Sequence, residues 1–315
     1  MKRLIALVLL ALAPLTASHA ALRVFACEPE WAALTHELGG SDVQVKLAST
    51  AGQDPHHIQA RPSLIAAMRR ADLLVCTGAG LEVGWLPVLL RRAGAGLEVG
   101  WLPVLLRRAG NGAVQPGQPG YFEAAAFVRL RDVPTRLDRA EGDVHPAGNP
   151  HIQTDPRNIA RVAAALGQRL MELDSAHRAA YGARLEHFQK RWRQAMERWD
   201  QEAADLRGVP VAVQHKGWVY LNDWLGLKEV ATLEPKPGVP PSAAHLAAVL
   251  EQLKSQPARL VIHAAYQDPR PSQWLAQHAH IPDVELPFTV GGTPGAGDLF
   301  GLFDDTLRRL REGLK

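Results

Sequence analysis

Strand-like and helix-like segments alternate along this chain in two halves, and this alternation most constrains its fold. In the first half, strand-like runs at 22–27, 43–49 and 73–77 are separated by helix-like stretches at 31–38 and 63–70. This βαβαβ order requires a mostly parallel sheet with helices on its faces, because parallel strands need helical crossovers. Ligands of such sheets bind at the carboxyl ends of the strands.

A long helical region precedes a second set of alternating segments. Alanine, leucine and charged residues recur at helical spacing from 158 to 207, and we expect a break in the helix near Asp174. The sequence therefore predicts an α/β fold of two Rossmann-like βα lobes with mostly parallel sheets, joined by a long rigid linker helix. The predicted lobes are 21–157 and 208–315. The second lobe has strand-like runs at 209–214, 229–233, 259–265 and 284–286, and helix-like stretches at 218–225, 242–254 and 272–278.

Residues 1–20 have the features of a signal peptide. Lys2 and Arg3 precede an apolar run at 4–12, and Ser18-His19-Ala20 is a small-x-small cleavage pattern. The run is too short to span a membrane, and no other stretch approaches 18 apolar residues. We expect cleavage near Ala20 and a periplasmic protein, with a lone N-terminal membrane anchor as the alternative.

The charge of the mature chain is close to neutral. Of 35 basic and 32 acidic residues, cleavage removes Lys2 and Arg3 only, so 33 minus 32 leaves a net charge of +1. This balance gives no electrostatic reason to expect nucleic-acid or membrane binding. We expect a monomer.

The two cysteines each end a strand-like run. Cys27 closes the run at 22–27, and Cys76 closes the run that begins at Leu73. If these strands are neighbours in the sheet, a disulfide is plausible in an oxidising compartment. The alternative is two small buried hydrophobic side chains.

Sixteen residues are repeated without change. Residues 78–93, GAGLEVGWLPVLLRRA, recur as 94–109. A single pair of identical copies is not the pattern of a solenoid, which needs several diverged repeats. One copy suffices for the fold, so we expect the other to bulge out as an extra helix-turn.

Four residues are placed to bind one metal ion. His56, His151, His215 and Asp298 each lie at a turn or helix start just after a predicted strand or loop, at intervals of 95, 64 and 83 residues. Three imidazoles and one carboxylate suit Zn2+. Each histidine has the alternative of an ordinary loop or helix-start residue, and Asp298 has that of a cap for its own helix. His145 is a secondary candidate, in the polar loop 136–150.

Three of the motifs resemble one known family. The motifs are Asp54-Pro55-His56 with Pro62-Ser63, Asn149-Pro150-His151 with Asp155-Pro156-Arg157-Asn158, and the segment 215–227. They resemble the cluster A-I, or ZnuA-like, solute-binding proteins of metal ABC importers. The Cys27-Glu28-Pro29-Glu30-Trp31 start and the 287–302 end resemble the AztC subgroup. The family pattern lacks the second copy of the 16-residue repeat.

The resemblance implies two lobes with the metal between them and a membrane permease as partner. For the AztC subgroup it also implies a periplasmic zinc metallochaperone as a possible donor. Four protein ligands leave no open position for a catalytic water, which favours carriage of zinc over catalysis. We therefore expect a periplasmic high-affinity zinc-binding receptor that delivers Zn2+ to an ABC importer permease, and not an enzyme. The alternatives are a manganese-binding receptor of the same family, an exported zinc-dependent hydrolase with Asp298 as base, and a surface adhesin.

Overall fold

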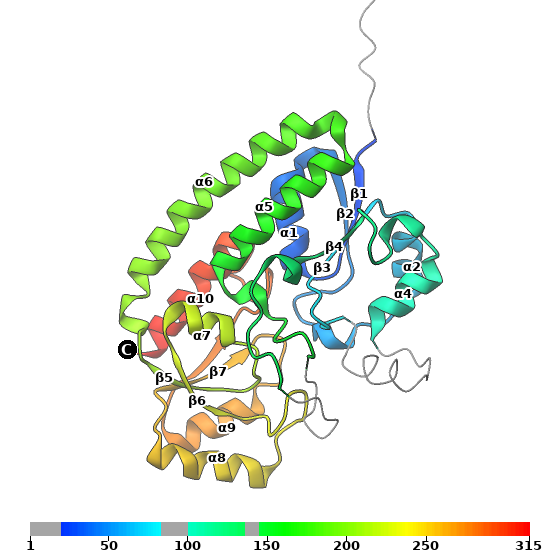
Figure 1. Cartoon of the computed structure of the whole chain (residues 1–315). Helices are drawn as coiled ribbons and strands as arrows, with labels where there is room; N and C mark the ends of the chain where they lie inside the picture. Colours follow the sequence, from blue (N-terminus) through cyan, green and yellow to red (C-terminus); the bar gives the residue numbers. More distant parts are fainter. Residues whose placement is uncertain (1–19, 83–99, 136–144) are drawn as a thin grey trace, which may run out of the picture.

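The computed structural model describes residues 20–82, 100–135 and 145–315 and contains two parallel four-stranded sheets (Figure 1). The predicted α/β class with two βα lobes is therefore confirmed. Both sheets have the same kind of order, with the first strand of each lobe second from one edge. The first sheet has the order β2 (Val43–Leu47), β1 (Leu22–Ala26), β3 (Leu73–Cys76), β4 (Tyr121–Glu123), and the second has β6 (Lys228–Thr232), β5 (Pro210–Val213), β7 (Leu260–Ala264), β8 (Asp283–Leu286).

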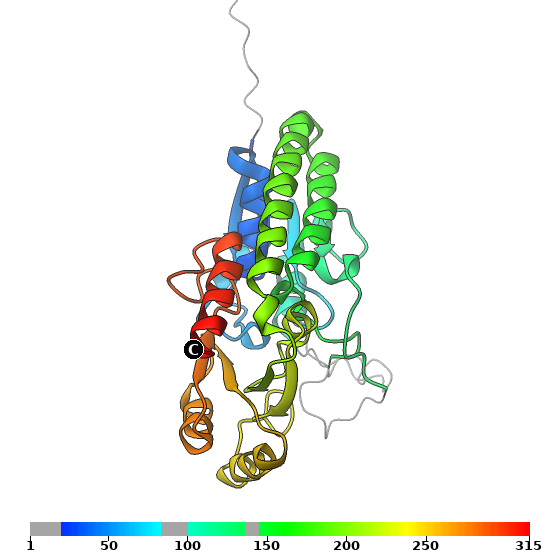
Figure 2. The ribbon, with the colours of Figure 1, turned by 90° about the vertical axis from the view of Figure 1, so that its left-hand side faces the viewer.

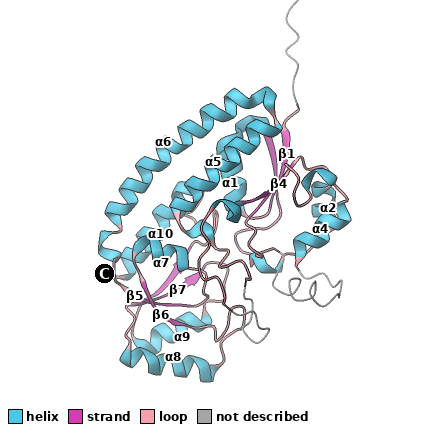
Figure 3. Ribbon diagram, in the orientation of Figure 1, coloured by secondary structure: helices cyan, strands magenta, loops and turns pink. Residues whose placement is uncertain are grey.

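Each sheet is buried on both faces, as a parallel sheet requires. In β1, Val24 belongs to the large core shared by the two lobes, whereas the next residue, Phe25, belongs to a separate cluster on the other face. This change follows from the two-residue period of a strand. Figure 3 shows the helices that flank the two sheets. The outer clusters are covered by α2 (Pro62–Met68) and α4 (Trp101–Ala109) in the first lobe and by α8 (Ala243–Ser255) and α9 (Arg270–Ala279) in the second.

Two helices occupy the predicted linker region, and they pack against each other. The helix α5 (Pro156–Leu173) ends at Asp174, where the sequence predicts a break, and α6 (Arg178–Glu202) runs back alongside it (Figures 1 and 2). The longer helix, α6, contacts both lobes, through α1 (Pro29–Gly39) of the first and α10 (Leu299–Gly313) of the second. The linker is therefore a helical hairpin of which α6 forms the strut.

Aromatic side chains of α6 pack against the second lobe. The rings of Trp192 and Trp199 are fully buried and lie 5.6 and 5.1 Å from the ring of Phe303 in α10. Such contacts join the two lobes through one continuous apolar core. A shared core of this kind favours small adjustments over a wide hinge motion.

The cysteines form the disulfide that the sequence made plausible. Cys27 and Cys76 lie at the ends of β1 and β3, which are hydrogen-bonded neighbours, and their Cα atoms are 4.8 Å apart. The bond closes a loop of 49 residues in the first lobe.

The described part of the repeat combines the start of the first copy with the end of the second copy. Gly78–Glu82 of the first copy contains buried Leu81 and Glu82, and α4 of the second copy buries Trp101. The amide of Leu102 donates to the carbonyl oxygen of Glu82 across 3.3 Å. In a single copy this pair would be four residues apart, as in an α-helix. The predicted extra helix-turn falls on 83–99, outside the described residues.

The remaining helix, α7 (Val219–Leu225), lies beside the second sheet. Within the described ranges, every helix is too short or too polar to serve as a membrane span. The predicted signal peptide lies outside them except for Ala20.

Candidate metal centre

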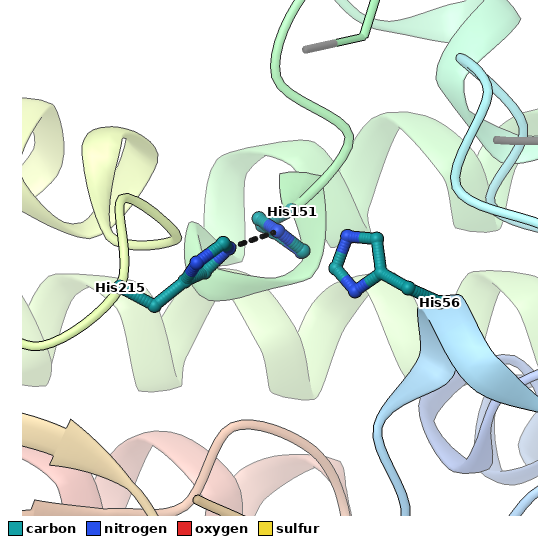
Figure 4. Close-up of side chains that lie close together, drawn as sticks. All are labelled: His56, His151 and His215. Carbon is teal, nitrogen blue, oxygen red and sulfur yellow. Dashed lines mark hydrogen bonds between the residues drawn. The ribbon is translucent and has the colours of Figure 1, made fainter. Parts of the chain in front are cut away.

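Three of the predicted ligands meet between the lobes. The side chains of His56, His151 and His215 approach one another from three separate segments (Figure 4), and one ring nitrogen of each lies within 4.8 Å of the others. The ring centroids are 5.3 Å apart for His56 and His151, 5.9 Å for His56 and His215, and 5.4 Å for His151 and His215. Residues spread over 160 positions of the sequence thus form one cluster.

A turn after β2 fixes His56. Asp54 caps the short helix Pro55–His57, and its carboxylate accepts hydrogen bonds from the His56 amide at 3.0 Å and from Nδ1 of the same ring at 2.7 Å. Burial opposes ionisation of Asp54, but these bonds outweigh it and lower its pKa to about 2. With a carboxylate on Nδ1, the lone pair of His56 lies on Nε2, the atom that faces the cluster.

His215 is held in the same way from the second sheet. It lies two residues after the end of β5, and its Nδ1 lies 2.8 Å from a carboxylate oxygen of Glu234, which follows the neighbouring strand β6. Glu234 also accepts a hydrogen bond from the Gly238 amide at 2.9 Å. Glu234 was missed at the level of sequence. The signal that could have found it is its position just after a strand predicted to lie in the same sheet.

His151 is the most deeply buried ligand candidate, with 1% of its surface exposed. Its amide donates to the Asn149 side chain at 3.0 Å, and its ring lies 5.0 Å from that of Phe288. Burial, followed by the charges of His56, His215 and His145, lowers its pKa well below the ordinary value for histidine. The ring is therefore neutral at pH 7 and has a lone pair free for a metal ion.

His145, the secondary candidate, lies against His56 but is not one of the three histidines whose ring nitrogens all lie within 4.8 Å of one another. Its Nε2 atom is 3.3 Å from Nε2 of His56, and Nε2 of His151 is 3.3 Å from Nε2 of His215. Burial, followed by the neighbouring histidines, lowers the pKa of His145 to about 3. Zinc binds histidine nitrogens at about 2.0–2.1 Å, so two ligands of a tetrahedral site lie about 3.3–3.4 Å apart. Both separations match an edge of such a tetrahedron.

Asp298 is not part of this cluster. Its exposed carboxylate accepts a hydrogen bond from the Gly301 amide at 2.7 Å and caps α10, which is the alternative role that the sequence allowed. In this structure the three predicted histidines lie together, and Asp298 lies apart from them as a helix cap.

Two other sets of side chains that can bind metals have different partners in this structure. Cys27, Cys76 and Glu82 lie close together, but the two sulfur atoms are joined in the disulfide. His263 is buried, and its Nδ1 atom lies 2.9 Å from Asp283 and 3.1 Å from the hydroxyl of Ser272. It is a core histidine with its own partners.

The chain is similar to known proteins over nearly its whole length. Residues 24–313 match the family model described as ZnuA, zinc-uptake complex component A, periplasmic. A high-affinity zinc uptake system protein ZnuA from Paracoccus denitrificans (strain Pd 1222) is 24% identical over 299 residues, which are 93% of this chain and 90% of that protein.

Solved structures of similar proteins share the fold. A ZnuA deletion mutant with zinc bound matches with a TM-score of 0.72 and 20% identity over 94% of this chain and 98% of the other. A manganese-bound periplasmic metal-binding protein from Candidatus Liberibacter asiaticus matches with a TM-score of 0.71 and 16% identity over 93% of this chain and 100% of the other.

Proposed function

The chain belongs to the ZnuA family of metal-binding receptors, and on this basis we propose that it is a periplasmic high-affinity receptor that binds one Zn2+ ion and delivers it to an ABC importer permease. Proteins of this family are solute-binding receptors and not enzymes, which excludes the exported hydrolase. Receptors of this kind work with ABC transporter permeases.

One observation carries the proposal: three histidines from both lobes present ring nitrogens within 4.8 Å of one another. Carboxylates on Nδ1 of His56 and His215 fix the two rings, so that Nε2 is the free nitrogen of each. The depressed pKa of His151 and His145 keeps those rings unprotonated, because burial and the charges of His56 and His215 oppose a positive charge. The cluster is ready to accept a cation at neutral pH.

Zinc is the preferred ion of this donor set. Imidazole nitrogen is a borderline donor that suits Zn2+, whereas Mn2+ prefers carboxylate, carbonyl and water oxygens. The manganese-bound relative keeps a manganese receptor as the alternative. Since the divalent ions differ in coordination geometry as well as donor type, a short-edged cluster of nitrogens favours the tetrahedral ion.

Two side chains compete for the fourth position around the ion. His145 lies 3.3 Å from His56 between their Nε2 atoms. Asp298 supplies an oxygen ligand only if the segment before α10 moves, since its carboxylate caps that helix. We propose His145 as the fourth ligand in the arrangement seen and Asp298 as the fourth ligand of a closed, metal-loaded form.

Export and partnership complete the proposal. A signal peptide cleaved near Ala20 would place the receptor in the periplasm as a monomer, and a periplasmic metallochaperone is a possible donor of its zinc. The family model carries the word periplasmic in its description, which supports export.

Isothermal titration of the signal-free protein with Zn2+ and Mn2+ tests the function. We expect one tight zinc site, weaker binding of Mn2+, and loss of the tight event in His215→Ala. His57→Ala is the matched control, because His57 is an exposed neighbour of His56 outside the cluster. Tight zinc binding that survives His215→Ala would refute the proposed site.

A second pair of variants separates the two candidates for the fourth ligand. Asp298→Asn keeps a good helix cap but removes the carboxylate charge, so a loss of zinc affinity reports ligation and not capping. His145→Ala removes the competing imidazole. If both variants bind zinc like the parent, the fourth ligand is neither residue.

A further inference from the structure

A cavity of about 380 Å³ lies beside the histidine cluster, on the side of the ligands that bears their carboxylate partners. His56 and His215 form part of its wall, whereas His145 and His151 do not. Asp54 and His57 also line it from the first lobe, and the rest of the polar lining comes from the carboxyl edge of the second sheet. Besides His215, that part consists of Gln214, Glu234, Tyr266, Gln267 and Asp268.

The cavity is rich in oxygen acceptors. The carboxylates of Asp54 and Glu234 each use one oxygen for a histidine Nδ1, and each has further lone pairs. Asp268 stands at the exposed rim, where it pairs with Arg270. An enclosure lined by two carboxylates favours a cation.

Gln214 is an independent observation that points to ligand binding in this cavity. Its side chain is 95% buried, and its Nε2 atom donates to the Asp268 carbonyl oxygen at 2.9 Å. Its Oε1 atom has no hydrogen-bond partner among the described residues. A buried amide oxygen without a partner is costly, and a hydrogen-bond donor in the cavity would relieve that cost.

The dimensions suit a cation that still carries its water. A divalent ion with about six waters needs about 180 Å³, at about 30 Å³ of liquid volume per water. That volume fits within the cavity. The carboxylates are not grouped with the three histidines in a set of ligand atoms within 4.8 Å. Contact through water is therefore the geometry that the cavity allows.

We propose that this cavity is a loading site, which holds the hydrated divalent cation by hydrogen bonds from its waters to Gln214, Asp54 and Glu234 before the ion exchanges water for His56 and His215. This inference rests on the proposed function, since it supplies the route by which the receptor takes up its cargo. The waters are replaced by imidazole nitrogens in the final site, and no other bond changes.

Stopped-flow kinetics with Zn2+ on the signal-free protein test the loading site. The association rate is measured directly, and the dissociation rate is measured by transfer of zinc to a large excess of a chromophoric chelator. Gln214→Leu removes the unpartnered oxygen, and Asp268→Asn removes a rim charge that touches no histidine of the cluster. Because a loading site lowers the barrier in both directions, we expect both rates to fall about 3–10-fold while Kd stays within about twofold.

Matched controls isolate the cavity. Gln153→Leu alters another buried glutamine whose Oε1 lacks a partner among the described residues and which lies two positions from His151, outside this cavity. Asp205→Asn alters another exposed carboxylate paired with an arginine, Arg311. Neither control should change the two rates together.

The outcomes separate the loading site from the function itself. Unchanged rates in Gln214→Leu and Asp268→Asn overturn the loading site and leave the receptor intact. A raised dissociation rate with an unchanged association rate also overturns it, because the residues then act on the final site. If the parent protein does not bind Zn2+, the proposed function fails first.

Discussion

Removal of residues 83–98 should leave a more stable protein with the same metal site. The deletion joins Glu82 to Val99 and restores a single copy of the repeat. The hydrogen bond from the Leu102 amide to the Glu82 carbonyl oxygen already has the partners of a helical turn in that shortened chain. The described fold therefore needs none of the deleted residues.

The expected gain follows from the entropy of loop closure. In the intact chain 17 residues, 83–99, connect Glu82 to Gly100 across this hydrogen-bonded contact. Closing a flexible loop of that length costs about 2.5 kcal/mol by the (3/2)RT ln n relation, and the deletion removes most of that cost. For a chain of this size the gain corresponds to a rise of about 5 °C in Tm.

Thermal unfolding of the metal-free, signal-free protein followed by circular dichroism measures the effect. Zinc titration of the same sample checks the site. A lower Tm, or loss of zinc binding in the shortened chain, would show that residues 83–98 are needed for folding and would refute the reasoning.

The variant Trp101→Ala sharpens this test. Trp101 is 4% exposed and donates from Nε1 to the Pro55 carbonyl oxygen at 3.0 Å, so its loss in the shortened chain should cost about 3–5 kcal/mol. In the full chain Trp85 begins an identical sequence and can replace Trp101 by a shift of 16 residues. A much smaller loss in the full chain would report that shift, and equal losses would exclude it.

Three further perturbations have expected outcomes. Glu234→Gln should weaken zinc binding about 10–100-fold in calorimetric titration, because Glu234 fixes the ring of His215, whereas Glu229→Gln, in the strand that precedes Glu234, should not. The free energy of unfolding of the metal-free protein, measured with denaturant, should fall between pH 7 and pH 5 by about 1–2 kcal/mol more in the parent than in His145→Ala. The reason is that the folded pKa of His145, about 3, lies below the unfolded value of about 6.5, so protons bind the unfolded chain first. Removal of the disulfide by Cys27→Ala with Cys76→Ala should cost about 4 kcal/mol for a loop of 49 residues, and an unchanged urea midpoint would contradict this.

Local patterns were enough to predict the lobes and three members of the cluster. The turns before His56 and His151 contain proline next to a side chain that binds the backbone amide of the histidine, so the local sequence alone fixes their conformation. His215 lies two residues after the end of an apolar strand, and strand ends of parallel sheets meet at one edge. These features depend on neighbours in sequence.

Other features depend on partners far apart in the chain. The contact between Glu234 and His215 requires β5 and β6 to be neighbours, which the order of segments does not specify. The folding of α5 back on α6 needs the buried rings of α6, and helical spacing alone does not distinguish a hairpin from one strut. Asp298 has two local roles, as cap and as ligand, and the choice between them is set by contacts outside its own segment.

One such contact ties the segment before Asp298 to the first lobe. The buried hydroxyl of Thr289 donates to the carboxylate of Glu30 at 2.5 Å. Capping by Asp298 is worth about 1 kcal/mol, far less than the 10–16 kcal/mol of a structural zinc site, so the cap alone cannot keep Asp298 from a bound ion.

If Asp298 binds the metal after the segment moves, the Thr289 contact opposes that movement. Thr289→Val should then strengthen zinc binding about 3–10-fold in competition titrations, and Thr289→Ser, which keeps the hydroxyl, should not. Weaker binding in Thr289→Val would mean that the fastened segment is already the metal-loaded arrangement, with His145 as the fourth ligand.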